Sequence, residues 1–240
     1  MDKDDKRLTR KLFLGNVQIG GGAPVSVQSM TSTDTRDVGK TVAQIRRLER
    51  AGCEIVRVAV PDDEAAAALP AIRKRICIPL IADIHFQHRL ALSAMAAGVE
   101  GIRINPGNMK KSALPEVVRA ARDQGTVIRI GVNAGSLERE VLARHGGPTA
   151  AALVESALAH IRLMEDLDFL SLKVSLKSSD VPTTISAYRL LADRVDYPLH
   201  LGVTEAGTML SAAIKSALGI GALLHRGIGD TIRVSVTGDP

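Results

Sequence analysis

Short runs of β-branched and other apolar residues alternate with longer helical patterns along most of the chain. Eight such runs predict β-strands, near residues 25–30, 54–60, 79–84, 101–105, 126–132, 169–176, 198–204 and 231–236. Helical patterns fill the intervals, near residues 37–51, 62–75, 87–97, 113–124, 149–166, 180–194 and 208–225. Strands that alternate with helices form parallel sheets. The pattern therefore predicts the α/β class and a parallel (β/α)₈ barrel of the TIM type, in preference to an open doubly wound sheet.

Capping residues mark the ends of the predicted helices. Side chains that accept hydrogen bonds from helix N-termini stand at Asp37, Asp62, Thr149 and Asp180. Glycines that favour helix C-termini stand at Gly52, Gly98 and Gly125. The glycine-rich run Gly219 to Gly229 lacks the Gly-Lys-Ser/Thr ending of a phosphate loop, so we expect a turn into the eighth strand there.

The segment before the first barrel strand predicts a small hairpin. Residues 12–22 contain two apolar runs around a turn at Gly15-Asn16, and we expect this hairpin to plug the bottom of the barrel. Residues 1–11 read as a charged N-terminal tail, and residues 1–240 as one TIM-type barrel domain. No eighth helix follows the last strand. A bare flank would expose apolar surface, so we expect a longer natural protein or a partner to cover it.

Six predicted strands carry a basic residue between two apolar ones: Arg57, Arg103, Arg129, Lys173, His200 and Arg233. Successive side chains of a strand point to opposite faces, so each basic residue faces away from its neighbours. The outer face of a barrel packs against helices and is apolar. The basic residues are therefore predicted to point inward.

Inward cations need partners, because an unpaired buried charge costs several kcal/mol. Clear acids near these strands are few, namely Asp83 after the third strand and Glu205 after the seventh. An anionic ligand best balances this surplus, and arginine forks match phosphate oxygens. We therefore expect a small, strongly anionic, phosphorylated ligand. Salt-bridged core residues or solvated strand-end charges are the alternative interpretation.

Further polar groups follow the strands, at the barrel end where active sites form. They are Asp83, His85, Asn105, Asn108, Asn133, Ser136, Ser175, Lys177, Thr204, Glu205 and Ser235. Lys173, Lys177 and Glu205 would also suit the Schiff-base and acid–base chemistry of an aldolase-like lyase.

Composition narrows the classes of function. The net charge is +5, but the basic residues are spread along the chain, and aromatic residues make up only 2 % with no Trp. Both features disfavour nucleic-acid binding. Apolar stretches are too short for a membrane span, and the charged N-terminus is no signal peptide. Cys53 and Cys77 are interpreted as buried, reduced thiols of a cytoplasmic protein and form no metal motif. The histidines His88, His145, His160 and His225 are interpreted as surface residues.

Several ordered motifs together resemble those of the bacterial 4-hydroxy-3-methylbut-2-enyl diphosphate synthase family of the methylerythritol phosphate pathway. They are the segments 22–31, 56–58, 82–86, 102–108, 129–137, 173–175, 204–207 and 229–235, including Asn105-Pro106-Gly107-Asn108. The resemblance extends from about Arg10 onward.

The resemblance implies an oxidoreductase of isoprenoid biosynthesis that reductively opens 2-C-methyl-D-erythritol 2,4-cyclodiphosphate and removes a hydroxyl. The barrel would be its substrate-binding domain. Residues implied to bind the substrate are Arg57, Arg103, Asn105, Arg129, Lys177, His200, Thr204, Arg233 and Ser235. Those implied for catalysis are Asp83, Asn133 and Glu205, with Glu205 as proton donor or hydroxyl-orienting acid.

Members of that family also carry a 4Fe-4S cluster, held by three cysteines and a glutamate in a smaller domain after the barrel. The resemblance implies an electron donor such as flavodoxin or ferredoxin, and a homodimer in which one subunit's cluster covers the other's barrel. No Cys-x-x-Cys occurs in this sequence, and we expect no metal ligands in it. The chain is interpreted as a truncated form that binds substrate and does not turn it over alone. A non-catalytic phosphate-binding barrel and the Schiff-base lyase remain the alternatives.

Overall fold

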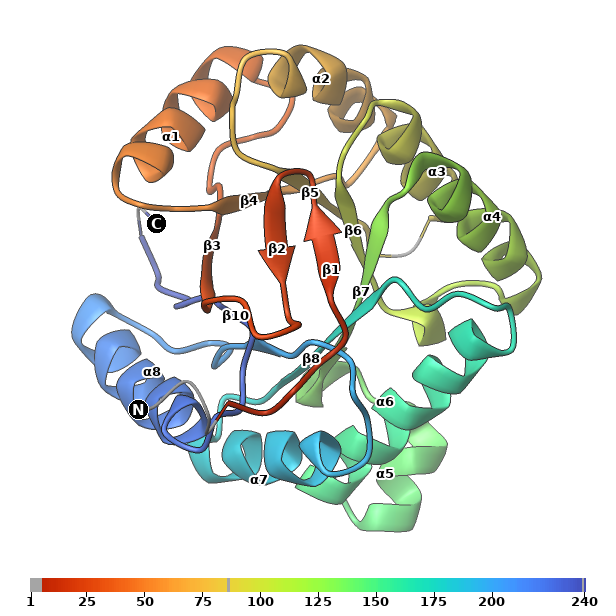
Figure 1. Cartoon of the computed structure of the whole chain (residues 1–240), viewed down its shortest axis with the longest axis vertical. Coiled ribbons are helices and arrows are strands. Elements are labelled where there is room, and N and C mark those ends of the chain that lie inside the picture. The colour runs from red at the N-terminus through yellow and green to blue at the C-terminus, as the bar shows by residue number, and fades with distance from the viewer. Residues whose placement is uncertain (1–5, 86, 239) are drawn as a thin grey trace.

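Eight parallel strands form a barrel in the computed structural model, which describes residues 6–85, 87–238 and 240 (Figure 1). The strands are β3 (Ser26–Met30), β4 (Ile55–Ala59), β5 (Leu80–Asp83), β6 (Gly101–Ile104), β7 (Val127–Asn133), β8 (Leu172–Lys177), β9 (His200–Leu201) and β10 (Thr231–Ile232). They pair in the order β8-β7-β6-β5-β4-β3-β10-β9, and a bridge between Val174 and Leu199 closes the ring. The predicted (β/α)₈ barrel is confirmed.

Helices surround the barrel. They are α1 (Val38–Arg50), α2 (Asp63–Arg73), α3 (His88–Ala96), α4 (Leu114–Gln124), α5 (Arg139–His145), α6 (Ala150–Glu165), α7 (Val181–Ala192) and α8 (Met209–Leu224). Three short 3₁₀ turns, η2 (Pro106–Asn108), η3 (Lys111–Ala113) and η4 (Ala134–Ser136), follow β6 and β7. The sequence did not predict α5, because seven residues are too short for a clear helical period. Within the described residues, no helix follows β10.

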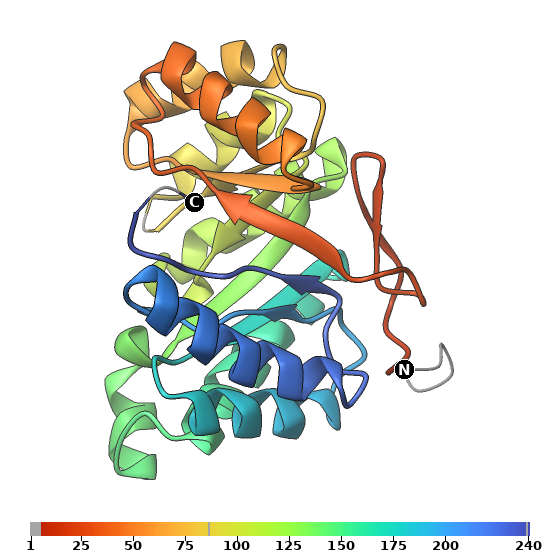
Figure 2. The ribbon, with the colours of Figure 1, turned by 90° about the vertical axis from the view of Figure 1, so that its left-hand side faces the viewer.

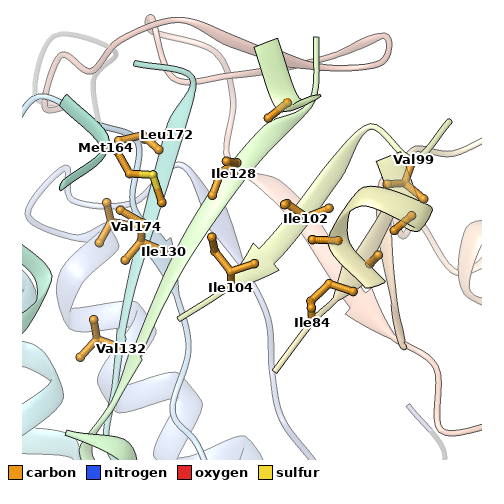
Figure 3. Close-up of a cluster of buried hydrophobic side chains, with 14 of the residues drawn as sticks. Ile84, Val99, Ile102, Ile104, Ile128, Ile130, Val132, Met164, Leu172 and Val174 are labelled. Carbon is orange, nitrogen blue, oxygen red and sulfur yellow. The ribbon is translucent and has the colours of Figure 1, made fainter. Parts of the chain in front are cut away.

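The main core lies between the strands and the surrounding helices. Figure 3 shows Ile128, Ile130 and Val132 of β7 in a common cluster with Val174 of β8. All four are at most 1 % exposed. They alternate with the inward-facing positions of their strands. The outward-facing apolar side chains of these strands thus pack against the helices, and the alternate side chains point into the barrel.

A two-stranded hairpin covers the end of the barrel where the strands begin (Figure 2). Its strands are β1 (Leu12–Leu14) and β2 (Val17–Ile19). The buried side chains Leu12, Leu14 and Ile19 form a second cluster with Ile55, Ile81 and Val127. A Cβ at Gly101 would lie 2.8 Å from Leu14 Cδ2, so the glycine makes room for this contact. The hairpin therefore plugs the bottom of the barrel.

The predicted helix caps are present. Asp37, Asp62, Thr149 and Asp180 each accept a hydrogen bond from a backbone N–H in the first helical turn. Gly125 ends α4 in the left-handed conformation, with φ 65°. The observed helix boundaries agree with the predicted ones to within one or two residues.

Four expectations are wrong. The last two strands are shorter than predicted: β9 ends at Leu201 rather than at residue 204, and β10 ends at Ile232 rather than at residue 236, with Val234 beyond it 49 % exposed. The glycine-rich run is not simply a turn, because α8 continues through its first half. Cys77 is exposed, whereas Cys53 is buried as expected. His160 is buried rather than on the surface, because it lies on the packed face of α6; Glu138 pairs with its Nε2 at 2.9 Å.

Candidate functional site

Charged residues stand side by side across four neighbouring strands. The strand registers pair Asp83 with Arg103, Arg103 with Arg129, and Arg129 with Lys173. All four side chains are buried. Since the alternate residues of these strands pack outward against helices, this row lies inside the barrel. The inward orientation expected for the basic residues is therefore observed.

A cavity of about 120 Å³ opens above this row. We call it the barrel cavity, and its lining residues are Arg57, Asp83, His85, Arg103, Arg129, Asn133, Ser175, Lys177, Thr204, Arg233 and Ser235. A larger hollow of about 470 Å³ lies beside α6 and α7, lined by residues such as Leu158 and Leu190. We take the barrel cavity as the candidate site because five cationic side chains converge on it from five strands or strand ends.

Asp83 is the acid at the centre of the barrel cavity. Its Oδ2 lies 3.5 Å from Arg57 Nε, and its Oδ1 lies 3.4 Å from Arg103 Nη1. His85 Nε2 lies 3.7 Å from Oδ2. Burial by itself would raise the pKa of Asp83, but the charge of Arg57, the hydrogen bond of His85 and the charge of Arg103 outweigh it and hold this pKa well below its usual range. Asp83 is therefore an ionised counter-charge at neutral pH.

One carboxylate leaves most of the positive charge unbalanced. Burial, followed by the charges of Arg57 and Arg103, lowers the pKa of Arg129. Burial, followed by the charge of Arg57, lowers the pKa of Arg233 to about 10. Within the described part of the chain, Arg129 Nε and Nη1 have no hydrogen-bond partner. Buried donors without acceptors are costly, so the cavity is suited to an anion that accepts from them.

Two glycines give the cationic side chains their space. A Cβ at Gly131 on β7 would lie 2.4 Å from Arg103 Nε. A Cβ at Gly202, which follows β9, would lie 2.8 Å from Lys177 Nζ. Any larger residue would displace one of these cations. Both glycines stand in the inward phase of their strands, but the sequence pattern singled out only charged and polar residues.

Nine of the predicted site residues line the barrel cavity: Arg57, Asp83, Arg103, Arg129, Asn133, Lys177, Thr204, Arg233 and Ser235. The other three do not. Asn105 is buried, and its Oδ1 accepts a hydrogen bond from Gly107 N at 3.1 Å, so it shapes the turn after β6. His200 is buried beside Thr231, with 2.8 Å between Nδ1 and Oγ1. Glu205 is exposed, with a backbone φ of 50°.

Lys173, one of the two Schiff-base candidates, does not line the barrel cavity. Its side chain is fully buried, and its Nζ has no partner among the described residues. Gln28 on β3 is likewise buried, and its side-chain amide lacks partners in the same part of the chain. Gln28 was not predicted as a site residue, and neither was Met30, whose Sδ lies 2.9 Å from Arg57 Nη2. Their alternation along β3 was the available signal.

The described residues do not fit an iron–sulfur cluster. Residues 6–85, 87–238 and 240 contain no group of three or more His, Cys, Asp or Glu side chains that could hold a metal ion. Buried Cys53 directs its Sγ to Ile55 O at 3.1 Å, while Cys77 is exposed. Among the helices described, none is long and apolar enough to cross a membrane.

Fold and site together define a (β/α)₈ barrel with a buried, cationic cavity at the C-terminal ends of its strands. Solved structures share this fold. 3-Dehydroquinate dehydratase from Geobacillus kaustophilus has a TM-score of 0.67 at 14 % identity, covering 98 % of this chain and 92 % of its own. Yersinia pestis dihydropteroate synthase has a TM-score of 0.60 at 15 % identity, covering 93 % and 91 %.

The chain belongs to the GcpE TIM-barrel domain family, whose sequence model matches residues 9–240. Similar curated proteins are named 4-hydroxy-3-methylbut-2-en-1-yl diphosphate synthase (flavodoxin). Those of Geobacter sulfurreducens and Caldanaerobacter subterraneus are 60 % and 59 % identical over 98 % of this chain. The protein of Nitratidesulfovibrio vulgaris is 58 % identical over the same share. The chain spans 67 %, 66 % and 61 % of the lengths of these three relatives. The family resemblance predicted from the motifs is confirmed.

Proposed function

We propose that this barrel binds 2-C-methyl-D-erythritol 2,4-cyclodiphosphate and is the substrate-binding part of a 4-hydroxy-3-methylbut-2-enyl diphosphate synthase. The observation that carries the proposal is the surplus of buried positive charge around the barrel cavity. Four arginines and Lys177 line it, with Asp83 as the one carboxylate among its lining residues. Membership of the GcpE TIM-barrel family supports the identity of the anion.

The diphosphate would bind the basic side of the cavity. We assign its phosphate contacts to Arg57, Arg103, Arg129, Lys177, Arg233 and Ser235. Asp83 and Asn133 line the same cavity and would face the carbon skeleton and its hydroxyls. Thr204 lies at the rim beside them. Arg103 is set for forked bonding, because Asp83 and Gly131 O already hold its guanidinium in place.

The cationic lining also suits the chemistry of ring opening. When the carbon–oxygen bond of a cyclic diphosphate breaks, the released terminal phosphate gains a negative charge that the ring did not have. Fixed cations bind that developing charge more strongly than the starting diester. Such differential binding lowers the barrier to the reaction. The reduction also needs a proton for the departing hydroxyl, and we assign this role to Glu205 at the exposed rim.

Electrons would reach the substrate from outside the barrel. The relatives are named as flavodoxin enzymes, so we propose flavodoxin as the donor and an iron–sulfur cluster held by residues outside this barrel. The family resemblance further supports pairing of two subunits, in which the cluster of one subunit covers the barrel mouth of the other. Thr204 lines the barrel cavity and is assigned to the substrate site, whereas Asn105 and His200 do not line it.

Calorimetric titration with the cyclic diphosphate tests the proposal. The wild-type chain should bind it, and Arg129→Ala should weaken binding by about 2 kcal/mol, roughly thirtyfold, because a charge-assisted contact is lost. Arg46→Ala, which alters an exposed arginine on α1, should leave the affinity unchanged. If the cyclic diphosphate does not bind, the proposed function is wrong. Unchanged affinity together with lower stability in Arg129→Ala would instead favour a structural role for this arginine.

A further inference from the structure

Lys177 occupies an unusual position among the cations of the barrel cavity. It is the last residue of β8, only 6 % exposed, and stands in register with Asn133 of β7. Its Nζ lies against the backbone at Gly202, where a Cβ would be 2.8 Å away. Within the described residues it forms no ion pair or hydrogen bond, since the nearby carboxylate of Asp83 pairs with Arg57 and Arg103.

Charged and titratable groups face Lys177 from every part of the barrel. They are Arg57 on β4, Asp83 and His85 at the end of β5, Arg103 on β6, Arg129 on β7, Lys173 on β8, His200 on β9 and Arg233 after β10. Arginine keeps its proton far more strongly than lysine does. Lysine loses its proton readily when it is buried. Lys177 is thus the cavity-lining cation that most readily relieves the crowding of positive charge.

We propose that Lys177 is a neutral amine in the empty barrel cavity and takes up a proton from solvent when an anion enters. The anion supplies the negative charge that the ammonium form needs, and the ammonium then donates hydrogen bonds to it. The step is a proton transfer from water or buffer to Nζ, with no oxidation or reduction. This inference rests on the proposed function only in that an anion must occupy the cavity.

The electrostatics of the empty site support this assignment. Burial is the largest influence and lowers the pKa of Lys177 well below its ordinary value, and the charges of Arg129, Arg57, Arg233 and Arg103 lower it further. Lys173 and His200 are also buried among cations, but neither lines the barrel cavity. Of these three groups, Lys177 is therefore the one that a bound anion would contact.

Proton uptake would matter for the ring-opening chemistry. The opened diphosphate carries one more negative charge than the cyclic form. A lysine that becomes charged on binding places an additional cation beside this charge without leaving an unpaired ammonium in the empty site. The empty barrel thereby avoids the desolvation cost of an unpaired ammonium at Lys177.

Calorimetry with sulfate tests the inference without the cyclic diphosphate. Sulfate is the anion of a strong acid and exchanges no proton of its own near neutral pH. The titration is done at one pH, slightly alkaline, in two buffers with different ionisation enthalpies. The wild-type chain should take up close to one proton for each sulfate bound, as linkage requires for a group whose pKa rises on binding.

Two substitutions of Lys177 distinguish the effect of its positive charge on sulfate affinity from the uptake of a proton. Lys177→Arg keeps a permanent charge, so it should bind sulfate with no uptake of protons. Lys177→Met should lose the uptake and bind sulfate about tenfold more weakly. Lys74→Met changes an exposed lysine at the end of α2 and should behave as wild type.

The outcomes are distinct. Sulfate binding with no dependence on the buffer overturns the inference, and so does failure to bind sulfate. Proton uptake that persists in Lys177→Arg also overturns it, because another group would then be responsible. If sulfate binds with uptake while the cyclic diphosphate does not bind, the inference holds and only the proposed function fails.

Discussion

At the scale of single residues, the carboxylate of Asp83 forms ion pairs with two arginines of the barrel cavity. Its two oxygens lie 3.5 Å from Arg57 Nε and 3.4 Å from Arg103 Nη1. Both arginines are buried, so each would otherwise be an uncompensated charge. Removal of one partner from a buried pair costs much more than the pair itself contributes. A single carboxylate therefore controls the arrangement of the site in the absence of a ligand.

Asp83→Asn should lower the free energy of unfolding by about 3–5 kcal/mol at neutral pH. Because the pKa of Asp83 is low in the folded state, this carboxylate stays ionised there at acidic pH values at which the unfolded chain protonates it. Its contribution is therefore complete above the unfolded pKa, about 3.9, and is lost as the pH falls below that value. Urea unfolding of both proteins from neutral to acidic pH measures the difference. A variant as stable as wild type at neutral pH would contradict this account.

The hairpin β1–β2 shows what a small element contributes to the barrel. Its inner face buries Leu14 completely, while Phe13 on the outer face is 52 % exposed. The two side chains are apolar neighbours in sequence, and they occupy opposite faces of the strand. The barrel floor is therefore built by the alternation of a three-residue strand.

Leu14→Ala should lower the free energy of unfolding by about 2–5 kcal/mol, because it leaves a cavity above Gly101. Phe13→Ala is the matched control on the same strand and should change it by less than about 1 kcal/mol. Thermal or urea unfolding measures both. Sulfate binding should persist in Leu14→Ala, because the hairpin lies at the opposite end of the barrel from the cavity. Equal effects of the two substitutions would show that the hairpin is not a plug.

At the scale of the whole molecule, the barrel interior brings together buried basic groups whose charged forms are unfavourable when no anion is bound. Burial, followed by the charge of Arg129, lowers the pKa of Lys173 and Lys177 well below 10.5. Burial and the same arginine lower the pKa of His200 well below 6.5. In the unfolded chain these groups regain their ordinary affinity for protons. The unfolded state therefore binds more protons than the folded one at intermediate pH.

The free energy of unfolding of the empty barrel should consequently rise with pH, up to the ordinary lysine pKa of 10.5. Urea unfolding at several pH values measures the slope. Saturating sulfate should flatten it, since the anion restores the proton of Lys177. Lys173→Met should flatten it as well and stabilise the empty barrel, because an apolar side chain replaces a buried amine. A slope that is zero or negative in the anion-free wild type would contradict this prediction.

The sequence alone determined the barrel, the order of its elements and the inward row of basic residues. Alternation decides which face of a strand each side chain occupies, and that rule is local. Nine of the twelve predicted site residues line one cavity. The sequence also predicted the hairpin, since the turn at Gly15-Asn16 and the flanking apolar runs are neighbours in the chain.

Only the tertiary structure decided which inward-facing side chains reach the cavity and which side chains of different strands touch, because both depend on distances between strands. Asn105 and His200 follow the same inward pattern as the cavity residues, but their depth in the barrel and their own partners take them out of the cavity. Gly131 and Gly202 matter because of side chains from other strands, which no local pattern encodes. His160 lies among the buried residues of α6, where Glu138 at the start of α5 pairs with its Nε2. Contacts between distant residues arise from strand register and shear, so they appear only when the barrel is closed.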